Sequence, residues 1–470
     1  MSTNKVKTAP EGIDATPRPF AEARPLPGPP YHEPSIFTAE LERIFFDMWV
    51  CAGHQDNIAA AGDYMVREIG GECALIVRDK EGVPRAFYNV CRHRGTRLVD
   101  EVRGASELDK ARGPATFAEP GKAGEPKSRE LGNRGETDGS GNRGQPGGGL
   151  ECIRCPYHGW SYGLDGRLLA APLMDEVEGF DKRDYPLTPI HLDTWEGFLF
   201  LNFSEDPAPL AGQLAGFPDV SRFQMAQMRL GGRHEYDIAA NWKLVCENYG
   251  ECYHCPSNHP QLNPISHFRS GGNSFDGEGF CGGPMRLNEG CSTMTLTGRS
   301  ERPPIAGLQG EDLRLVHYFN LYPAFLLSLH PDYVLTHTVW PIDAGRSRIV
   351  CEWLFPPQAV EAEGFDPSDA IEFWNMTNEQ DWAICERAQK GVRSRGYRPG
   401  RYQRLERTIY FFDSWYLRMM GSVLRDGWGQ APTGPAPRDG REPAPATRPA
   451  LGDGREHLPA TGPALRDGPE

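Results

Sequence analysis

The sequence lacks any long apolar run. Its more apolar stretches, such as 323–329 (PAFLLSL), fall far short of the ~20 residues that cross a bilayer. The first residues, MSTNKVKTAPEG, also lack the apolar core of a secretory signal peptide. These two absences predict a chain without a membrane-spanning segment, and we expect a cytoplasmic location.

Basic residues are too few for a nucleic-acid-binding protein, and cysteines are too few for a protein built on disulfides. The chain has 50 Lys and Arg against 64 Asp and Glu, a net charge of -14, so we expect no nucleic-acid partner. Its 12 cysteines in 470 residues do not suggest a disulfide-built scaffold, and several stand beside histidines. Reduced thiols, some of them bound to metal, are the expectation for a cytoplasmic protein.

Glycine and proline, in contrast, are abundant: 54 and 42 residues. Two segments concentrate the low-complexity sequence. Segment 104–147 contains only three large apolar residues, Leu108, Phe117 and Leu131, which cannot offset the entropy lost on ordering. The tail 429–470 repeats itself, since PATRPALGDG returns as PATGPALRDG. Both segments are predicted to be disordered.

The remaining chain alternates between strand-like and helix-like patterns. A small β domain is predicted over 45–175, and an α+β domain with an antiparallel sheet is predicted after it. The expected strands are 64–69, 74–78, 84–89, 160–162, 167–169, 198–203, 333–340 and 348–355. The expected helices are 241–255 and 367–390.

Two short motifs each place one cysteine near one histidine: Cys91 with His93, and Cys155 with His158. Four such ligands suit zinc or an iron–sulfur cluster. The symmetry of the pairs favours a [2Fe–2S] centre in which each loop gives a thiolate to one iron and an imidazole to the other. A zinc ribbon that uses Cys152 and Cys155 is the alternative.

The wording of these motifs, CRHRG and CPYHGWSYGLDG, resembles the Rieske domain family. The 61 residues between His93 and Cys155 depart from the family, but removal of 104–147 would leave 17, a spacing similar to the family's. Because the cost of loop closure grows only logarithmically, such an insertion costs about 1–2 kcal/mol. We therefore expect the cluster to tolerate it.

A second set of ligands is predicted further along the chain. Glu251 and His254 stand three residues apart on the helix expected to begin near Asn241, and His259 follows beyond Pro256. The downstream helix starts with Asp366 as its cap and Pro367 at its first position, and it ends at Gly391. One stripe of this helix is apolar except at its centre, where Asn378 and Asp381 lie. The residues of the stripe are Ile371, Trp374, Asn378, Asp381, Cys385 and Ala388.

A carboxylate that faces a core is costly unless it is paired or bound to a cation. His254, His259 and Asp381 together would form a 2-His-1-carboxylate site for mononuclear Fe(II) with positions open for O₂. A plain salt bridge is the alternative role for Asp381.

With both motifs present, residues 35–425 resemble the α subunits of Rieske non-haem iron oxygenases, the ring-hydroxylating family; NEQDWAICERAQKGVRS resembles that family's C-terminal helix. The resemblance implies an α+β fold in which a small all-β Rieske domain is inserted into a helix-grip catalytic domain. It also implies a homotrimer and a separate flavin/iron–sulfur reductase, or a ferredoxin, that delivers electrons from NAD(P)H. The resemblance implies four parts. Residues 1–44 form an N-terminal segment that joins the catalytic domain, residues 45–175 form the Rieske domain, residues 176–428 form the catalytic domain and residues 429–470 form the tail.

The resemblance gives Glu251 the role of an electron-transfer bridge between His254 and a Rieske histidine, His158 of the partner subunit. Its alternative role is a solvated helix carboxylate. Asn248, one turn earlier in the expected helix, would support the iron site or pack in the core.

The substrate is predicted from resemblance as well. Glu251, the ECYHC segment and RGYRPGRY are similar to the branch that oxidises quaternary ammonium compounds, including carnitine and glycine betaine monooxygenases. Hydroxylation or demethylation of a small organic substrate is therefore the expected activity. Aromatic-ring dihydroxylation and a Rieske electron carrier without oxygenase activity are the alternatives. Candidates for an aromatic cage around a cation, or for ordinary core positions, are Tyr318, Phe319, Tyr322 and Trp340.

Overall fold

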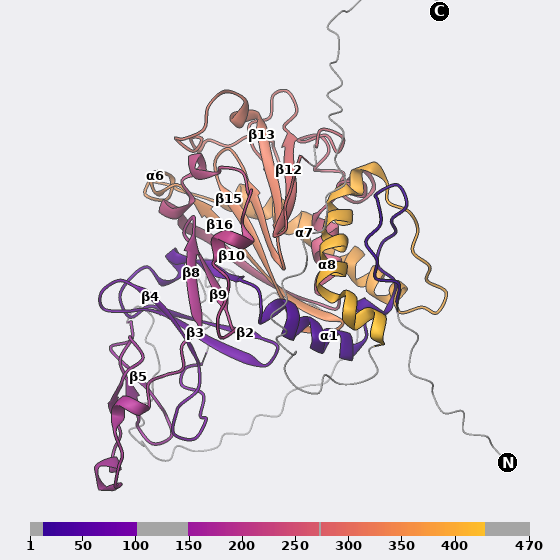
Figure 1. Ribbon diagram of the computed structural model, residues 1–470. Coiled ribbons are helices and arrows are strands. Elements are labelled where there is room, and N and C mark those ends of the chain that lie inside the picture. The colour runs from indigo at the N-terminus through magenta and orange to yellow at the C-terminus, as the bar shows by residue number, and fades with distance from the viewer. Residues whose placement is uncertain (1–12, 101–148, 272–273, 428–470) are drawn as a thin grey trace, which may run out of the picture. The chain divides into compact units, whose positions relative to one another are not determined.

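A seven-stranded antiparallel sheet is the scaffold of the larger domain in the computed structural model (Figure 1). The strand order is β10-β16-β15-β14-β13-β12-β11. The strands are β10 (Arg229–Ile238), β11 (Phe275–Asp276), β12 (Phe280–Arg286), β13 (Leu315–Leu321), β14 (Phe325–Leu329), β15 (Val334–Asp343) and β16 (Arg346–Phe355). The predictions of an antiparallel sheet and of strands at 333–340 and 348–355 are confirmed.

Alternation along β13 separates the two faces of this sheet. Phe319 and Leu321 pack into a core with Phe198 and Phe200, whereas Tyr318 lies against the helices. Side chains two residues apart point to the same face of a strand, so Asn320 shares the helix-covered face with Tyr318. The sheet thus has one face covered by strands and one covered by helices.

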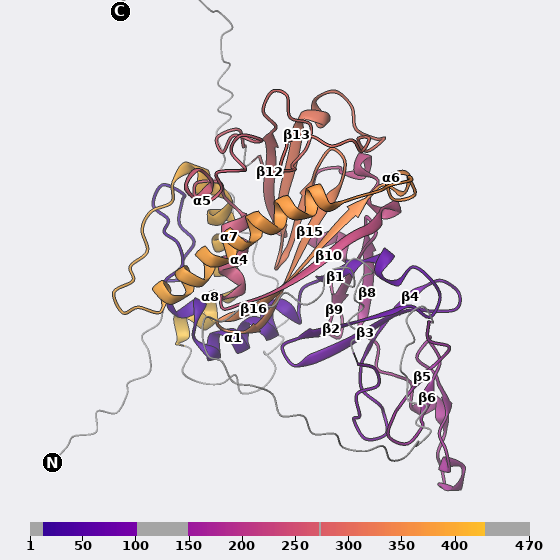
Figure 2. The ribbon, with the colours of Figure 1, turned by 180° about the vertical axis from the view of Figure 1, so that it is seen from behind.

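Helices α4, α7 and α8 cover the second face, and Figure 2 shows α7 running across the sheet. The α-helices are α1 (Pro34–Glu40), α3 (Leu210–Gln213), α4 (Trp242–Tyr249), α5 (Cys255–Asn258), α6 (Pro357–Val360), α7 (Ser368–Val392) and α8 (Arg407–Asp426). The predicted helix 367–390 is α7, which begins one residue later and ends two residues later than predicted, so Gly391 lies inside the helix and does not end it. Pro367 precedes the helix, and the Asp366 carboxylate accepts a 2.9 Å hydrogen bond from the Ser368 backbone N–H.

The predicted helix 241–255 is wrong as one continuous element. The structure ends α4 at Tyr249, and Gly250 to His254 form an irregular turn before the short α5. Gly250 donates its backbone N–H to the carbonyl of Cys246, which closes the last turn of α4. Glycine stabilises a helix interior poorly, which favours termination at this point.

Three-stranded antiparallel sheets form the smaller domain and its junction with the larger one. The strands are β1 (Val50–His54), β2 (Tyr64–Ile69), β3 (Glu72–Arg78), β4 (Pro84–Tyr88), β5 (Ile153–Arg154), β6 (Ser161–Tyr162), β7 (Leu168–Ala170), β8 (His191–Trp195) and β9 (Phe198–Asn202). They group as β2-β3-β4, β5-β6-β7 and β1-β9-β8. The predicted strands of the β domain are confirmed within one or two residues.

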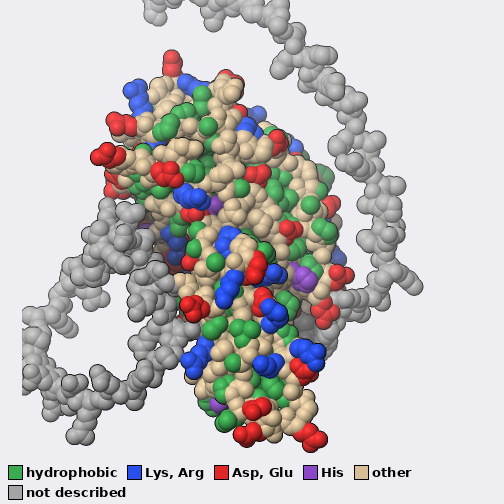
Figure 3. All heavy atoms as spheres, turned by 90° about the vertical axis from the view of Figure 1, so that its left-hand side faces the viewer, with side chains coloured by type: hydrophobic (Ala, Val, Ile, Leu, Met, Phe, Trp, Pro, Cys, Tyr) green, Lys and Arg blue, Asp and Glu red, His purple; other side chains and the backbone are tan. Residues whose placement is uncertain are grey.

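The structure describes residues 13–100, 149–271 and 274–427. The predicted disordered segment 104–147 and tail 429–470 lie outside these ranges. Among the described helices, none is both long enough and apolar enough to cross a membrane. Acidic and basic side chains are interspersed over the face seen in Figure 3.

Candidate functional site

The two Cys–His loops of the smaller domain lie together. The Cys91 thiol is in hydrogen-bonding contact with the Cys155 thiol and lies 3.3 Å from the Tyr162 hydroxyl. The rings of His93 and His158 are 4.7 Å apart between centroids. The structure therefore brings cysteine beside cysteine and histidine beside histidine.

Burial separates these two pairs. Both cysteines are buried, at 3% and 2% exposure, whereas both histidines are exposed. A tetrahedral zinc ion holds its four ligand atoms within about 4 Å of one another. The ligand atoms of Cys91, His93, Cys155 and His158 do not lie that close together. Among the described residues, the one group with three or more possible ligand atoms within 4.8 Å of one another consists of other residues. The arrangement fits a two-iron cluster with a buried sulfur end and an exposed histidine end.

That other group is His254, His259 and Asp381. The Nε2 atoms of the two histidines are 3.1 Å apart, and Asp381 Oδ1 lies 3.2 Å from His254 Nε2 and 2.9 Å from His259 Nε2. Ligands on one face of an octahedral ion with bonds of about 2.1 Å are about 3 Å apart. The triangle therefore fits a mononuclear metal ion, and nitrogen and carboxylate donors suit iron.

Hydrogen bonds on the far side of each ring set its orientation. His254 Nδ1 lies 2.6 Å from Glu251 Oε1, and His259 Nδ1 lies 2.7 Å from Gln380 Oε1. An Nδ1–H that donates to these oxygens leaves both Nε2 lone pairs directed at the same point. Gln380 was not identified from the sequence, where only its position beside Asp381 could have indicated it.

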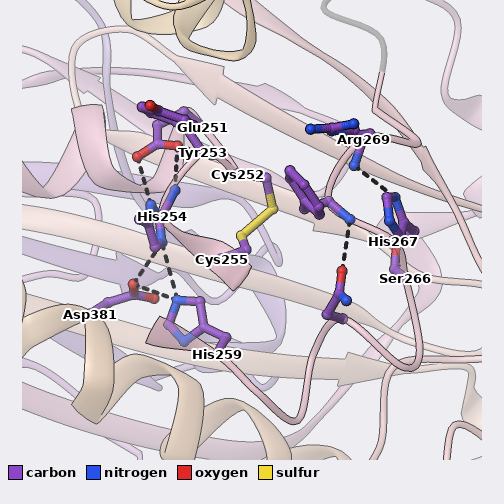
Figure 4. Close-up of a disulfide and its surroundings, with 12 residues drawn as sticks. Glu251, Cys252, Tyr253, His254, Cys255, His259, Ser266, His267, Arg269 and Asp381 are labelled. Carbon is purple, nitrogen blue, oxygen red and sulfur yellow. Dashed lines mark hydrogen bonds and ion pairs between the residues drawn. A yellow bond between two sulfur atoms is a disulfide. The ribbon is translucent and has the colours of Figure 1, made fainter. Parts of the chain in front are cut away.

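Glu251 reaches His254 from the turn after α4, as Figure 4 shows. Its second carboxylate oxygen accepts hydrogen bonds from the backbone N–H groups of Tyr253 and His254. The predicted contact between Glu251 and His254 is present, but a turn produces it and not a shared helix face. Asn248 lies on α4, and its side chain lines the cavity beside this turn.

A disulfide links Cys252 to Cys255 and brackets His254 (Figure 4). The expectation of reduced thiols is wrong for this pair. The cause is local, because the turn places the two Cα atoms 4.9 Å apart, within the range of disulfides. The bond encloses Tyr253 and His254 in a small ring next to the metal-binding triangle.

Without a metal, His254 is held between two carboxylates. Burial lowers the pKa of His254, but hydrogen bonds to Asp381 and Glu251 outweigh burial and raise it to about 10. Burial raises the pKa of Asp381, yet hydrogen bonds from His254 and His259 bring it below its ordinary value. A proton therefore occupies the place that a cation would take.

A cavity of about 300 Å³ opens directly onto the triangle. Its aromatic lining consists of Tyr249, Phe268, Tyr318 and Trp374. Of the four aromatic residues predicted for a cage, only Tyr318 lines this cavity. Phe319 points to the opposite face of the sheet, Tyr322 stacks on Trp415, and Trp340 lies at the strand-covered side.

Backbone also forms part of the cavity wall at Gly282 on β12. Its φ of +154° suits glycine, and a Cβ atom there would collide with the carbonyl oxygen of Tyr318. The close approach of β12 to β13 thus requires glycine at this position.

Two protein-family models match the chain. Residues 48–112 and 141–181 match the Rieske [2Fe-2S] domain, and residues 225–422 match the catalytic domain of the ring hydroxylating alpha subunit. Together the matches cover well over half of the chain. They leave 113–140 unmatched, which lies inside the insertion expected from the sequence.

Two curated relatives align with more than four fifths of the chain. The glycine betaine monooxygenase oxygenase subunit of Pseudomonas aeruginosa UCBPP-PA14 is 29% identical over 84% of this chain and 89% of its own length. The carnitine monooxygenase oxygenase subunit of Escherichia coli K12 is 27% identical over 83% of this chain and 89% of its own length.

Two solved structures are similar to the present one. The quaternary ammonium Rieske monooxygenase CntA, in complex with its substrate gamma-butyrobetaine, is 26% identical with a TM-score of 0.62, over 84% of this chain and 95% of that chain. Naphthalene 1,2-dioxygenase from Rhodococcus sp. shares the fold at 16% identity and a TM-score of 0.61, over 84% of this chain and 94% of that chain.

Enzymes of this family are oxidoreductases that carry a Rieske [2Fe–2S] cluster and a mononuclear iron and consume O₂ with electrons from a reductase. The two domain matches occur in the family's order, and the described structure supplies both sets of metal-ligand residue types. The chain belongs to the Rieske non-haem iron oxygenases, as an α subunit of the ring-hydroxylating family.

Proposed function

We propose that this chain is the oxygenase subunit that removes a methyl or neighbouring carbon from a quaternary ammonium compound. The observation that carries the proposal is the aromatic-lined cavity that opens onto His254, His259 and Asp381. Aromatic faces attract alkylammonium cations through their ring quadrupoles. The similarity to oxygenase subunits named for glycine betaine and carnitine supports the same substrate class.

His254, His259 and Asp381 would hold the mononuclear iron, and Cys91, His93, Cys155 and His158 would hold the [2Fe–2S] cluster. With both groups bound, the cluster would supply electrons singly and the mononuclear iron would supply oxygen activation. Glu251 keeps the His254 ring in place and links it to the protein surface. The proposed net reaction inserts one oxygen atom of O₂ into a C–H bond and reduces the other to water with two electrons and two protons.

A head-to-tail trimer in the cytoplasm, supplied by a flavin/iron–sulfur reductase or a ferredoxin, completes the proposal. The β5–β6 region and α5 lie on opposite sides of the described structure in Figure 2, at its lower right and upper left. Tyr157, next to His158, is 58% exposed, and Tyr253, next to His254, is 55% exposed. Two exposed tyrosines beside the two centres support contact between His158 of the partner subunit and Glu251.

The test is an NAD(P)H-coupled assay of the purified chain with a reductase of this family. Glycine betaine, gamma-butyrobetaine and benzoate are compared, with formaldehyde or the cleaved amine as the product of the ammonium substrates. We expect coupled turnover of at least one ammonium compound and none of benzoate. A cis-diol from benzoate, without turnover of any ammonium compound, would replace the proposal by aromatic dihydroxylation.

A further inference from the structure

One buried amide in the cavity has no hydrogen-bond partner within the described residues. Asn320 is 1% exposed, it lines the cavity, and neither its Nδ2 nor its Oδ1 atom is bonded. Buried polar groups in proteins are almost always paired, because an unmade hydrogen bond is costly. The amide is therefore a candidate for a bond to a ligand in the cavity.

The side chain of Asn320 faces the start of α8. Asn320 pairs with Cys281 across β13 and β12, and residues directly opposite each other share one face of a sheet. The Cys281 thiol lies 3.6 Å from the carbonyl oxygen of Thr408, the second residue of α8. Thr408 also lines the cavity. Asn320 and the first turn of α8 consequently bound the same part of the cavity.

Two arginines stand at or just before this turn: Arg407 is the first residue of α8, and Arg404 lies in the 3₁₀ turn Arg404–Glu406 that precedes it. Arg404 and Arg407 both line the cavity, both are exposed, and neither guanidinium forms an ion pair with a described residue. Arg407 lies over the ring of Phe411, at 5.5 Å from its centroid. The intervening Glu406 is not among the residues that line the cavity, and its carboxylate accepts a 2.5 Å hydrogen bond from the backbone N–H of Gln403.

The acidic side chains of the cavity are already engaged. Glu251 and Asp381 both bond to His254. In a chain with a net charge of -14, two unpaired guanidinium groups and an unpaired amide form a local set of donors for an anion. Planar guanidinium groups match carboxylate oxygens in particular.

We propose that Asn320, Arg404 and Arg407 bind the carboxylate of a zwitterionic substrate whose ammonium end contacts the aromatic lining. This inference rests on the proposed function and narrows it. It selects betaine-type substrates, which carry a carboxylate, over choline-type cations, which do not. The three residues are binding residues that determine specificity.

The test is calorimetric titration of the holoenzyme with gamma-butyrobetaine and with its methyl ester. The two probes share the trimethylammonium group and the carbon chain, but only the first carries a carboxylate. We expect the wild type to bind gamma-butyrobetaine at least about tenfold more tightly than the ester. Equal affinities, or tighter binding of the ester, would overturn the inference.

Variants test which residues cause the preference for gamma-butyrobetaine over its methyl ester. The double variant Arg404→Gln/Arg407→Gln should lose about tenfold or more in affinity for gamma-butyrobetaine and change less than about threefold for the ester. Lysine at both positions should restore part of the preference. Arg418→Gln removes an exposed arginine of α8 that does not line the cavity, and this variant should change neither affinity. A double variant that keeps the full preference would contradict the inference.

Asn320→Leu separates ligand binding from a structural role. Because its amide has no described partner, the variant should keep or raise the melting temperature while its affinity for gamma-butyrobetaine falls. A lower melting temperature with unchanged affinity would remove Asn320 from the site. If the wild type binds only the ester, this inference fails and the proposed substrate class stands; if it binds neither probe, both fail.

Discussion

Glu251 contacts His254 on the side of the ring that faces away from the metal-binding triangle. Replacement by glutamine keeps the shape of the side chain and removes its charge. We expect Glu251→Gln to retain its iron and its Rieske spectrum, because it supplies no ligand, and to lose about 10–100-fold in coupled product formation. Glu379→Gln, an exposed substitution on α7, is the matched control. Parent-like turnover of Glu251→Gln would remove it from the electron path.

His254 makes iron binding dependent on pH. Its pKa of about 10 keeps it protonated at neutral pH in the metal-free protein, and this contribution to stability is lost as pH rises towards 10. A metal ligand must be a neutral imidazole, so about one proton should leave per Fe(II) bound at pH 7.5. The apparent affinity should rise about tenfold per pH unit below pH 10. A pH-stat titration that detects no proton release would contradict this assignment.

The individual ligands could be predicted from the sequence because their spacing has a chemical meaning. The aromatic lining could not. Alternation along β13 indicates that Tyr318 and Phe319 point to opposite faces, but which face meets the cavity depends on helices distant in sequence. Trp374 appeared in the sequence only as part of an apolar stripe, and the structure places it in the cavity wall.

Among the elements, α4 and α8 meet through two carboxyl groups, one half-buried on α4 and one buried on α8. Glu247 on α4 accepts a 2.8 Å hydrogen bond from the Tyr31 hydroxyl, and Asp413 on α8 accepts a 2.6 Å bond from the Tyr402 hydroxyl. The two carboxyl groups also share a hydrogen bond, which requires a proton on one of them. Burial raises the pKa of both, that of Asp413 to about 7.

This pair predicts a stability that depends on pH. A carboxyl group whose pKa is raised in the folded state stabilises the fold below its unfolded pKa of about 4, and the contribution is lost as pH rises to 7. Asp413→Asn cannot ionise, so the variant should gain at least about 1 kcal/mol over the parent at pH 8 and gain less at pH 5. Urea unfolding at both pH values is the measurement. An equal or negative difference at pH 8 would contradict the shared-proton account.

The elements themselves were largely predictable, apart from the segment that carries the site. The strands and α7 follow their apolar periodicities, whereas the 241–255 pattern continues through Gly250 although the helix does not. The turn that replaces it depends on side-chain bonds from Glu251 and on the Cys252–Cys255 link. Local periodicity contains no information on either interaction.

In the whole trimer, the proposed function requires electrons to pass between subunits. A chain with His158→Ala lacks a cluster ligand, and a chain with Asp381→Ala lacks an iron ligand. Each should be inactive alone. Co-expressed in equal amounts, they should regain about a quarter of the parent activity, since random mixing places both intact centres at one interface in one of four arrangements. Mixed trimers without activity would indicate transfer within one chain.

We propose that the chain holds two separate iron centres on two sets of ligands. Iron and acid-labile sulfide analysis of the purified protein tests it most directly. The parent should contain about three iron atoms and two sulfides per chain, and Asp381→Ala should contain about two of each with an unchanged Rieske electron paramagnetic resonance signal. A parent with zinc and no labile sulfide, or an Asp381→Ala variant that keeps its third iron, would contradict the account.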